Sequence, residues 1–241
     1  MIWTKEQLRQ PVWDTNVVYG ESITMVRDDN GAAAAPLLFD PIHILEVSNA
    51  GGTEIYEEGR DWVFEDGLLK LTERSRIFAF TKDELYPAEG VPGQSFALPE
   101  GYLLFHEGSF FIDRQIIVTY TCKRDGWKGV RPVPAKEQLP RTFELLHGKK
   151  PMSVVLYGDS ISARANATEL MCIPPYQPDW GKLLIQHLTD HYGVEIDFHN
   201  TAVGGMDAVW ARDNAKERVA AHKPDLAIIA FGMNDIGKEP P

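Results

Sequence analysis

The chain has 241 residues, of which 44% are hydrophobic and 24% charged, as in an ordinary globular protein. Its 24 basic and 35 acidic residues give a net charge of −11, which repels phosphate backbones, so nucleic acid is excluded as an expected partner. No apolar run approaches the roughly 20 residues of a membrane span, and the first residues do not read as a signal peptide. We therefore expect a cytoplasmic protein with one large domain or two of ordinary size.

The first half of the sequence contains short β-rich runs separated by turn residues, from about residue 17 to residue 122. In DWVFEDGLLKL, the pair Asp66-Gly67 lies between two apolar runs and predicts a hairpin. In QIIVTYT, alternation predicts a strand with Ile116, Val118 and Tyr120 on one face. The regular spacing of strands and turns indicates an all-β sandwich or jelly roll.

A proline-rich stretch follows the β-rich half. Pro132, Pro134 and Pro140 suit an extended connector, because proline is poorly tolerated inside helices and strands. The next residues, TFELLHG, predict a short helix that ends at Gly148. We place the domain boundary here, with a β-sandwich accessory domain and its connector over residues 1–147 and a second domain over residues 148–241.

From Lys150 onward, predicted strands and helices alternate. The strands are SVVLYG, VEIDFHN and DLAIIAFG, the last expected to be buried, and the helices are PDWGKLLIQHLTDHYG and DAVWARDNAKERVAAHK. Gly193 and Pro224 are the expected stops of the two helices. This alternation predicts an α/β fold with an open parallel sheet, whose ligand site lies at the carboxyl ends of the strands.

The first strand ends in Gly158-Asp159-Ser160. Glycine tolerates the tight turn, and we expect Ser160 to be exposed where a following helix starts. Its hydroxyl would then be accessible, and its own backbone N–H would be oriented to stabilise an oxyanion. The tripeptide therefore points to a serine nucleophile, although the same pattern is common in a plain helix cap.

The other two strands end in hydrogen-bond donors. NTAVGGMD follows the second strand, where Gly205 offers a backbone N–H that no side chain obstructs. GMND follows the third strand, where the side-chain amide of Asn234 is a further donor. Because the three strand ends meet at one edge of the sheet, we expect a nucleophile and its oxyanion donors to converge there.

The segments YGDSIS, NTAVGG and FGMND resemble the first three sequence blocks of the SGNH/GDSL hydrolases, over residues 152–235. The resemblance implies a flavodoxin-like sheet with a serine esterase site and no cofactor. Ser160 would be the nucleophile, and the N–H groups of Ser160 and Gly205 with the Asn234 side chain would form the oxyanion hole. The β-rich half also resembles the accessory sandwich that precedes the esterase domain in some carbohydrate-active bacterial members.

A serine nucleophile needs a base, which this family supplies from a late Asp-x-x-His block. The sequence ends at Pro241, seven residues after Asn234, without that block. We interpret the chain as an incomplete version of a longer hydrolase. The later histidines have no aspartate three residues earlier, and we expect structural roles for them: His187, His191, His199 and His222. Asp40 and His43 do have the spacing, but they lie in the β-rich half, where we expect no catalytic group.

The loop after the nucleophile contains two aromatic residues, Tyr176 and Trp180. We predict that they bind substrate by stacking on a sugar ring. The alternative for Trp180 is a core position at the start of the following helix.

These observations favour a hydrolase of carbohydrate O-acyl esters, most plausibly acetyl esters, acting through an acyl-enzyme. The expected partner is an oligosaccharide or small-molecule ester. A lipase or thioesterase for small acyl chains stays open, and so does a non-catalytic glycan-binding protein. With three strands in the second domain, the last would lie at the edge of the sheet. We therefore predict that a second copy or a further segment covers it.

Overall fold

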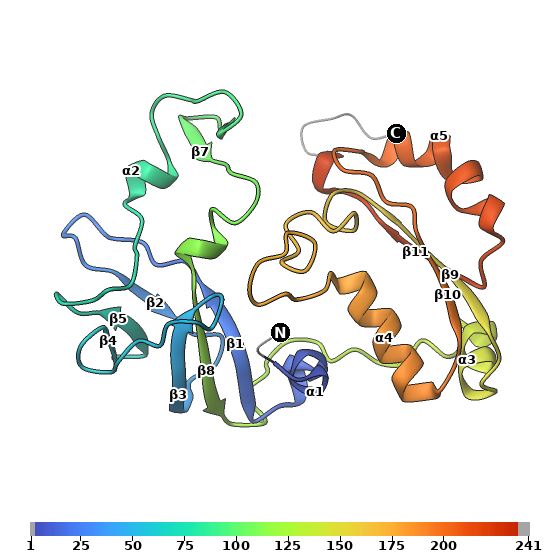
Figure 1. The fold of residues 1–241 in the computed structure, drawn as a ribbon, viewed down its shortest axis with the longest axis horizontal. Helices are drawn as coiled ribbons and strands as arrows, with labels where there is room; N and C mark the ends of the chain where they lie inside the picture. Colours follow the sequence, from blue (N-terminus) through green and yellow to red (C-terminus); the bar gives the residue numbers. More distant parts are fainter. Residues whose placement is uncertain (1–2, 236–241) are drawn as a thin grey trace. The chain divides into compact units, whose positions relative to one another are not determined.

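The computed structural model describes residues 3–235, which form two compact units (Figure 1). The first unit comprises the chain up to Arg131 together with Met171–Tyr176. The second unit comprises Pro132–Leu170 and the chain from Gln177 onward. The domain boundary that we placed between residues 147 and 148 stays a prediction.

The first unit is built from antiparallel strands. One sheet has the order β1-β8-β3, with β1 (Val17–Ile23), β8 (Ile116–Cys122) and β3 (Pro41–Asn49). A second has the order β2-β5-β4, with β2 (Ala34–Pro36), β5 (Leu68–Leu71) and β4 (Trp62–Glu65). The pair β6 (Ser95–Ala97) and β7 (Tyr102–Leu104) completes the strands. The short helices are α1 (Lys5–Arg9), α2 (Lys82–Leu85) and the 3-10 turns Val12–Asp14 and Ile112–Arg114.

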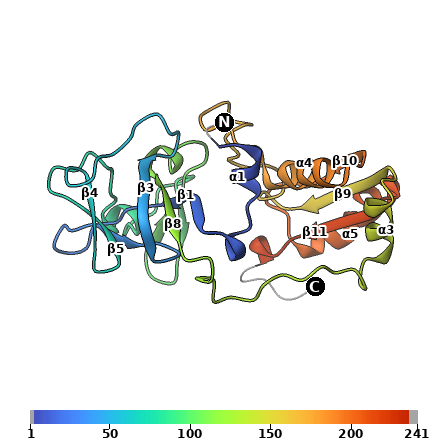
Figure 2. The same cartoon turned by 90° about the horizontal axis from the view of Figure 1, so that it is seen from below.

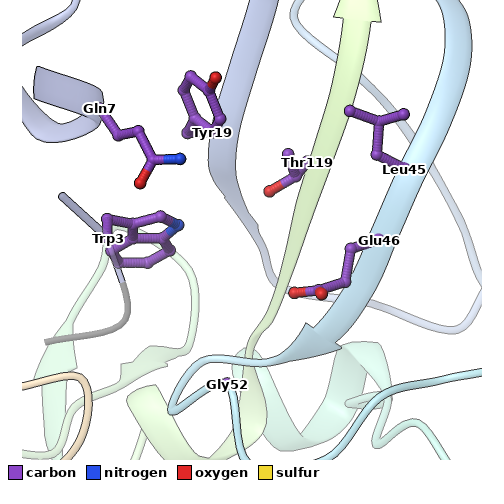
Figure 3. A pocket seen from close by; sticks show the side chains of 7 residues that line it. All are labelled: Trp3, Gln7, Tyr19, Leu45, Glu46, Gly52 and Thr119. Carbon is purple, nitrogen blue, oxygen red and sulfur yellow. The ribbon is translucent and has the colours of Figure 1, made fainter.

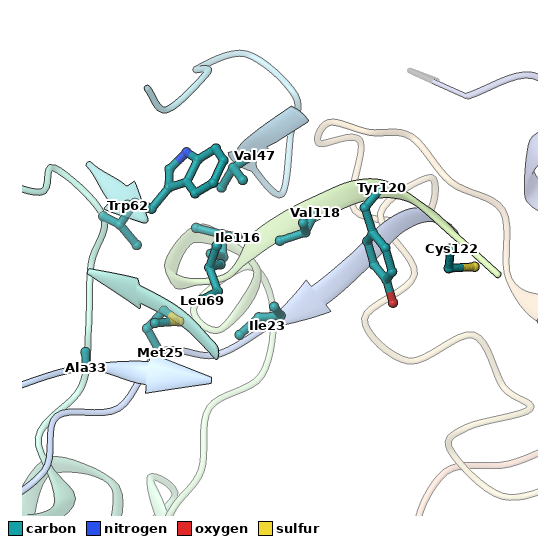
Figure 4. Close-up of a cluster of buried hydrophobic side chains, with 11 residues drawn as sticks. Ile23, Met25, Ala33, Val47, Trp62, Leu69, Ile116, Val118, Tyr120 and Cys122 are labelled. Carbon is teal, nitrogen blue, oxygen red and sulfur yellow. The ribbon is translucent and has the colours of Figure 1, made fainter. Parts of the chain in front are cut away.

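A single hydrophobic core joins the two larger sheets of this unit (Figure 4). Val118 and Tyr120 of β8 are fully buried in it, together with Leu69 of β5 and the nearly buried Trp62 of β4. Ile116 belongs to the same core. The face predicted from alternation in QIIVTYT is therefore confirmed, and so is the β-rich character of the first half.

The predicted hairpin is also present. β4 and β5 pair antiparallel across Asp66 and Gly67, whose φ angles are 55° and 77°. Two consecutive residues with positive φ match the right-handed twist of the strands in a tight hairpin, which favours Asp-Gly at these positions.

The second unit alternates strands and helices. Its elements in order are α3 (Pro140–His147), β9 (Met152–Gly158), α4 (Trp180–Tyr192), β10 (Ile196–Asn200), α5 (Ala208–Arg218), a 3-10 turn at Ala220–His222, β11 (Leu226–Ala230) and a 3-10 turn at Met233–Asp235. The strands are all parallel in the order β10-β9-β11. This confirms the predicted parallel α/β sheet for the described part of the domain. All three strands therefore end at the same edge.

Helices cover both faces of this sheet (Figure 2). Val154 of β9 packs in a cluster with residues of α3 and α4, among them Leu188. The next residue, Val155, packs in a second cluster with Trp210 and Ala211 of α5. Because successive strand residues point to opposite faces, β9 is buried on both sides and gives the continuous apolar run seen in the sequence.

Two details differ from the sequence predictions. Pro140 is the first residue of α3 rather than part of the connector, because proline fits the first helical turn, where its missing N–H has no helical acceptor. The third strand, β11, was expected to be buried, but Ile229 is 67% exposed. Its place at the edge of the sheet within residues 3–235 is the one that three strands predict.

None of the helices within residues 3–235 has the length and apolar character needed to cross a bilayer. In the same range, no three His, Cys, Asp or Glu side chains form a group that could hold a metal ion.

Candidate active site

The site begins at the carboxyl ends of the paired parallel strands β9 and β11. The backbone N–H of Asp159 donates to the carbonyl oxygen of Ala230 at 3.2 Å. A Cβ added to Gly158 would lie 2.6 Å from that same oxygen, closer than real contacts allow. Glycine at position 158 therefore lets the two strand ends approach each other.

Ser160 follows in a series of turns and is half-buried. The N–H of Ala163 donates to the carbonyl of Asp159 at 2.9 Å, but the next bond runs from Ala165 to Ser160 with a longer spacing. Arg164 then has a φ of 68°, which does not continue a helix. The prediction that an exposed Ser160 opens a helix is therefore wrong. Because Ser160 does not start a helix, no helix dipole acts on its backbone N–H. The hydrogen bonds of the turn orient this N–H instead.

Buried polar groups hold this turn in place. Asp159 is buried, and its Oδ1 accepts a hydrogen bond of 3.0 Å from the N–H of Ile161. Asn200, at the end of β10, donates from Nδ2 to the carbonyl of Ser162 at 2.8 Å. Its Oδ1 accepts from the N–H of Ala202 at 3.1 Å. Our sequence reasoning assigned Asn200 no role, although an Asn at the last strand position is a signal for such a turn.

The loop after β10 brings Gly204 against the nucleophile. The N–H of Val203 donates to the carbonyl of Gly158 at 2.9 Å, which extends the pairing of β10 with β9. A Cβ built on Gly204 would lie 3.6 Å from Cβ of Ser160. The next peptide N–H along the loop is that of Gly205, which has a φ of 78° and open space where a side chain would be. Gly205 therefore follows Gly204, the residue that lies next to Ser160, and its positive φ favours glycine.

Asn234 is joined to the same loop. Its Nδ2 donates to the carbonyl oxygen of Met206 at 2.9 Å. The next residue, Asp235, accepts from the N–H of Ala208 at 3.0 Å and so binds the start of α5. Asp235 is a second residue whose role the sequence reasoning missed. These two hydrogen bonds hold the end of β11 to the loop that carries Gly205.

A pocket of about 280 Å³ opens beside the nucleophile turn in the second unit. Its lining is mainly apolar: Asp159, Ile161, Ser162, Trp180, Ala230, Phe231 and Met233. Trp180 is 37% exposed at the first position of α4, so its ring both borders the pocket and covers part of the helix start. Oγ of Ser162 is buried and has no hydrogen-bond partner within residues 3–235.

Tyr176 belongs to the first unit and is 47% exposed, with a φ of 58°. Its role in substrate binding stays a prediction, as do the catalytic roles of Ser160, Gly205 and Asn234 and the substrate role of Trp180.

The histidines of the second unit pair with one another or with aromatic rings. The rings of His187 and His191 stack in α4, with centroids 5.7 Å apart. The ring of His199 lies tilted against that of His222, with centroids 4.4 Å apart, and its Nε2 is 3.0 Å from a carboxylate oxygen of Asp197. Across the part of the chain that the structure describes, no histidine is hydrogen-bonded to Ser160.

Three comparisons place this geometry among known proteins. Residues 156–241 match a family model described as the GDSL-like lipase/acylhydrolase family. No curated protein matches the sequence. The similar solved structures include two of a two-domain esterase (CEX) active on acetylated mannans, one of them co-crystallised with mannopentaose.

The identity to these two structures is 15% and 16%, with a TM-score of 0.35 for both. The match covers 44% and 42% of this chain, and only 27% and 26% of the esterase chains. The chain therefore spans about a quarter of the esterase's length, and at this TM-score the likeness carries no argument about function.

Proposed function

We propose that this chain, whose C-terminal part is a GDSL-like lipase/acylhydrolase domain, belongs to a serine hydrolase that cleaves carbohydrate O-acyl esters, chiefly acetyl esters. One observation carries the proposal. The loop of Gly204 to Met206 passes beside Ser160 at one end, where a Cβ on Gly204 would lie 3.6 Å from Cβ of Ser160, and accepts a hydrogen bond from Asn234 at the other. The ends of three strands therefore meet at this loop. They carry the proposed nucleophile Ser160, the N–H of Gly205 and the side-chain amide of Asn234.

In the proposed reaction, Oγ of Ser160 attacks the ester carbonyl carbon and its proton passes to a base. The carbonyl oxygen becomes an oxyanion, which the N–H groups of Ser160 and Gly205 and the amide of Asn234 stabilise. The carbon–oxygen bond to the sugar breaks, and the departing sugar oxygen takes up the proton from the base to become a hydroxyl. Water then attacks the acyl-enzyme, releasing the acid and restoring the serine. In this proposal residues 3–235 supply the nucleophile and the donors, but within them no histidine is in hydrogen-bond contact with Ser160 to act as the oriented base.

The pocket beside the turn supports a small acyl group. Ligand pockets usually enclose about 300–1,000 Å³, and this one is about 280 Å³. Ile161, Phe231 and Met233 give it an apolar lining that suits a methyl group. This volume holds an acetyl group with space to spare and also admits longer acyl groups, so the acyl length is left to the assay below.

The alcohol part of the substrate is proposed to be a neutral sugar. The net charge of −11 disfavours anionic substrates such as phosphorylated or polyanionic esters. Trp180 borders the pocket and offers an aromatic face on which a pyranose ring can stack. In this proposal the N-terminal β domain is an accessory sandwich that contributes no catalytic group.

A non-catalytic glycan-binding protein is the second candidate. The observation that favours it is the lack of a histidine hydrogen-bonded to Ser160 in the described residues. The two functions separate in one assay of the 241-residue chain, with imidazole supplied as an external base and its own background rate subtracted. The assay compares 4-nitrophenyl acetate with the octanoate ester in the parent and in Ser160→Ala. The hydrolase proposal expects faster release of 4-nitrophenol from the acetate, and loss of that activity in the variant. Equal rates for parent and variant would favour the binding protein.

A further inference from the structure

A pocket of the first unit lies on the outer face of the sheet β1-β8-β3, beneath α1 (Figure 3). It has a volume of about 390 Å³. We call it the α1 groove, and its lining residues all belong to the first unit: Trp3, Gln7, Tyr19, Leu45, Glu46, Gly52 and Thr119.

The floor of the α1 groove is a row of residues across three strands. Glu46 of β3 is the register partner of Thr119 in β8. On the other side of Thr119, the register of β1 shifts between Val18 and Glu21, so that Tyr19 and Gly20 together oppose Thr119. Such a bulge redirects side chains and is common next to binding sites. Here it turns Tyr19 toward the groove beside Thr119.

The bulge also seats the indole of Trp3. Gly20 has a φ of 63°, and a Cβ at this position would overlap the Trp3 ring. The N–H of Gly20 donates to Oγ1 of Thr119 at 3.1 Å, which fixes the bulge against β8. Trp3 therefore packs its ring on bare backbone and forms one wall of the groove.

Polar groups face this wall. Oε1 of Gln7 accepts a hydrogen bond of 2.7 Å from the N–H of Thr4, which orients the side chain and turns its amide nitrogen toward the groove (Figure 3). The carboxylate of Glu46 and the hydroxyl of Thr119 point toward Trp3 from the sheet (Figure 3). An amide donor, a hydroxyl and a carboxylate acceptor thus surround one space between two aromatic rings.

We infer that the α1 groove is a non-catalytic binding site for a neutral sugar unit of an oligosaccharide. A pyranose has an apolar ring face that stacks on an aromatic side chain and hydroxyls that both donate and accept, which matches Trp3, Tyr19, Gln7 and Glu46. The volume lies within the range of small-molecule sites. The site does not depend on the chemistry of Ser160.

Two other ligand classes fit less well. The lining has no Lys or Arg, and the Glu46 carboxylate repels anions, which excludes phosphorylated or acidic ligands. A quaternary ammonium would be attracted by Glu46 and the aromatic rings. It would leave the donors of Gln7 and Thr119 without acceptors, whereas sugar hydroxyls satisfy them.

The test uses the full chain with Ser160→Ala, so that hydrolysis does not interfere. Isothermal titration calorimetry with mannopentaose, cellopentaose and xylopentaose, at concentrations up to millimolar, should detect binding of at least one. Trp3→Ala should lower the association constant about tenfold or more, because aromatic anchors dominate such sites. Trp127→Ala, which removes an indole outside the groove, is the matched control and should bind as the parent does.

Glu46→Gln keeps the side chain's shape and should weaken sugar binding only severalfold, since an amide oxygen still accepts from a hydroxyl. Circular dichroism confirms that each variant is folded. The inference is overturned if none of the three sugars binds, or if a folded Trp3→Ala variant binds like the parent. It is also overturned if tetramethylammonium binds in place of the sugars and Glu46→Gln abolishes that binding. A failure of the esterase proposal would appear in the chemistry of Ser160 and would leave sugar binding intact.

Discussion

The side-chain amide of Asn234 donates a hydrogen bond of 2.9 Å to the carbonyl oxygen of Met206. Met206 follows Gly205, so this bond ties the end of β11 to the loop that lies against Ser160. This bond uses one N–H of the amide in positioning, and the proposed mechanism assigns the second N–H to the substrate oxygen. Asn234 therefore has two separable tasks: it holds the loop and, in the proposed mechanism, it stabilises the oxyanion.

In an enzyme that has its base, or with imidazole supplied as an external base, Asn234→Ala should lower kcat for 4-nitrophenyl acetate by roughly 10²–10³, the usual effect of removing one oxyanion donor. KM should change much less, because the negative charge develops mainly in the transition state. Steady-state kinetics give both constants. Asn214→Ala, on the far part of α5, is a matched control that should leave kcat unchanged. If Asn234→Ala raises KM and leaves kcat unchanged, Asn234 only binds substrate.

Gly158→Ala should destabilise the second unit by about 1–3 kcal/mol, the typical effect of forcing extra atoms into a packed site. The new Cβ would lie 2.6 Å from the carbonyl oxygen of Ala230 and push β9 and β11 apart. Gly204→Ala is the matched control, because its Cβ would make an ordinary contact of 3.6 Å with Ser160. Urea unfolding measures both. Equal stability of the two variants would show that the close approach of β9 and β11 at Gly158 does not contribute to stability.

Asp61 in the first unit predicts a pH dependence of stability. Its side chain is fully buried, with Oδ2 2.6 Å from Nη2 of Arg76. The hydrogen bond from the Arg76 guanidinium lowers the pKa of Asp61 well below its usual value, with further help from the N–H groups of Glu57 and Arg76. Because the folded-state pKa is lowered, the stabilisation is complete above about pH 4 and is lost as the pH falls below it.

Asp61→Asn should therefore cost about 2–4 kcal/mol at pH 7, because it leaves a charged Arg76 without its buried partner. The difference from the parent should shrink as the pH falls below 4. Urea unfolding at several pH values measures this trend. Asp66→Asn removes an exposed carboxylate paired with Lys70 and should have little effect at any pH. A stability difference for Asp61→Asn that does not depend on pH would contradict the assignment.

The edge strand β11 predicts self-association. It pairs with β9 on one side, and on the other side it has no strand partner within residues 3–235. Exposed edges with apolar side chains such as Ile229 are templates for pairing with another chain. Light scattering of the 241-residue chain should show a mass above that of the 27.1 kDa monomer. Ile229→Lys should reduce the association, whereas Val130→Lys, which changes an exposed valine outside the sheets, should not. A monomeric parent would contradict this prediction.

Local patterns were sufficient for much of the fold. Asp66-Gly67 predicted its hairpin because the turn needs two residues with positive φ. The apolar run of β9 fits a parallel strand, because helices cover both of its faces. Gly193, with a φ of 66°, ends α4 as expected for a left-handed helix terminus.

Other features depend on contacts that a sequence pattern does not contain. The turn at Ser160 looks like a helix start, but Asp159 and Asn200 fix it by hydrogen bonds from a buried side chain and another strand. The α1 groove requires a bulge at Gly20 and a tryptophan 17 positions earlier, a pairing that no periodicity reveals. The 67% exposure of Ile229 in β11 follows from the strand order, which hydrophobicity alone does not specify.

The central claim is that Ser160 is the nucleophile, and the most direct measurement is its reaction with a serine-reactive fluorophosphonate. The 241-residue chain is incubated with the reagent, with and without added imidazole as an external base, and the adduct is located by peptide mass spectrometry. We predict one phosphonylated residue, Ser160, with labelling accelerated by imidazole and absent from Ser160→Ala. Labelling of Ser160 no faster than that of Ser153 or Ser162, with or without imidazole, would contradict the account.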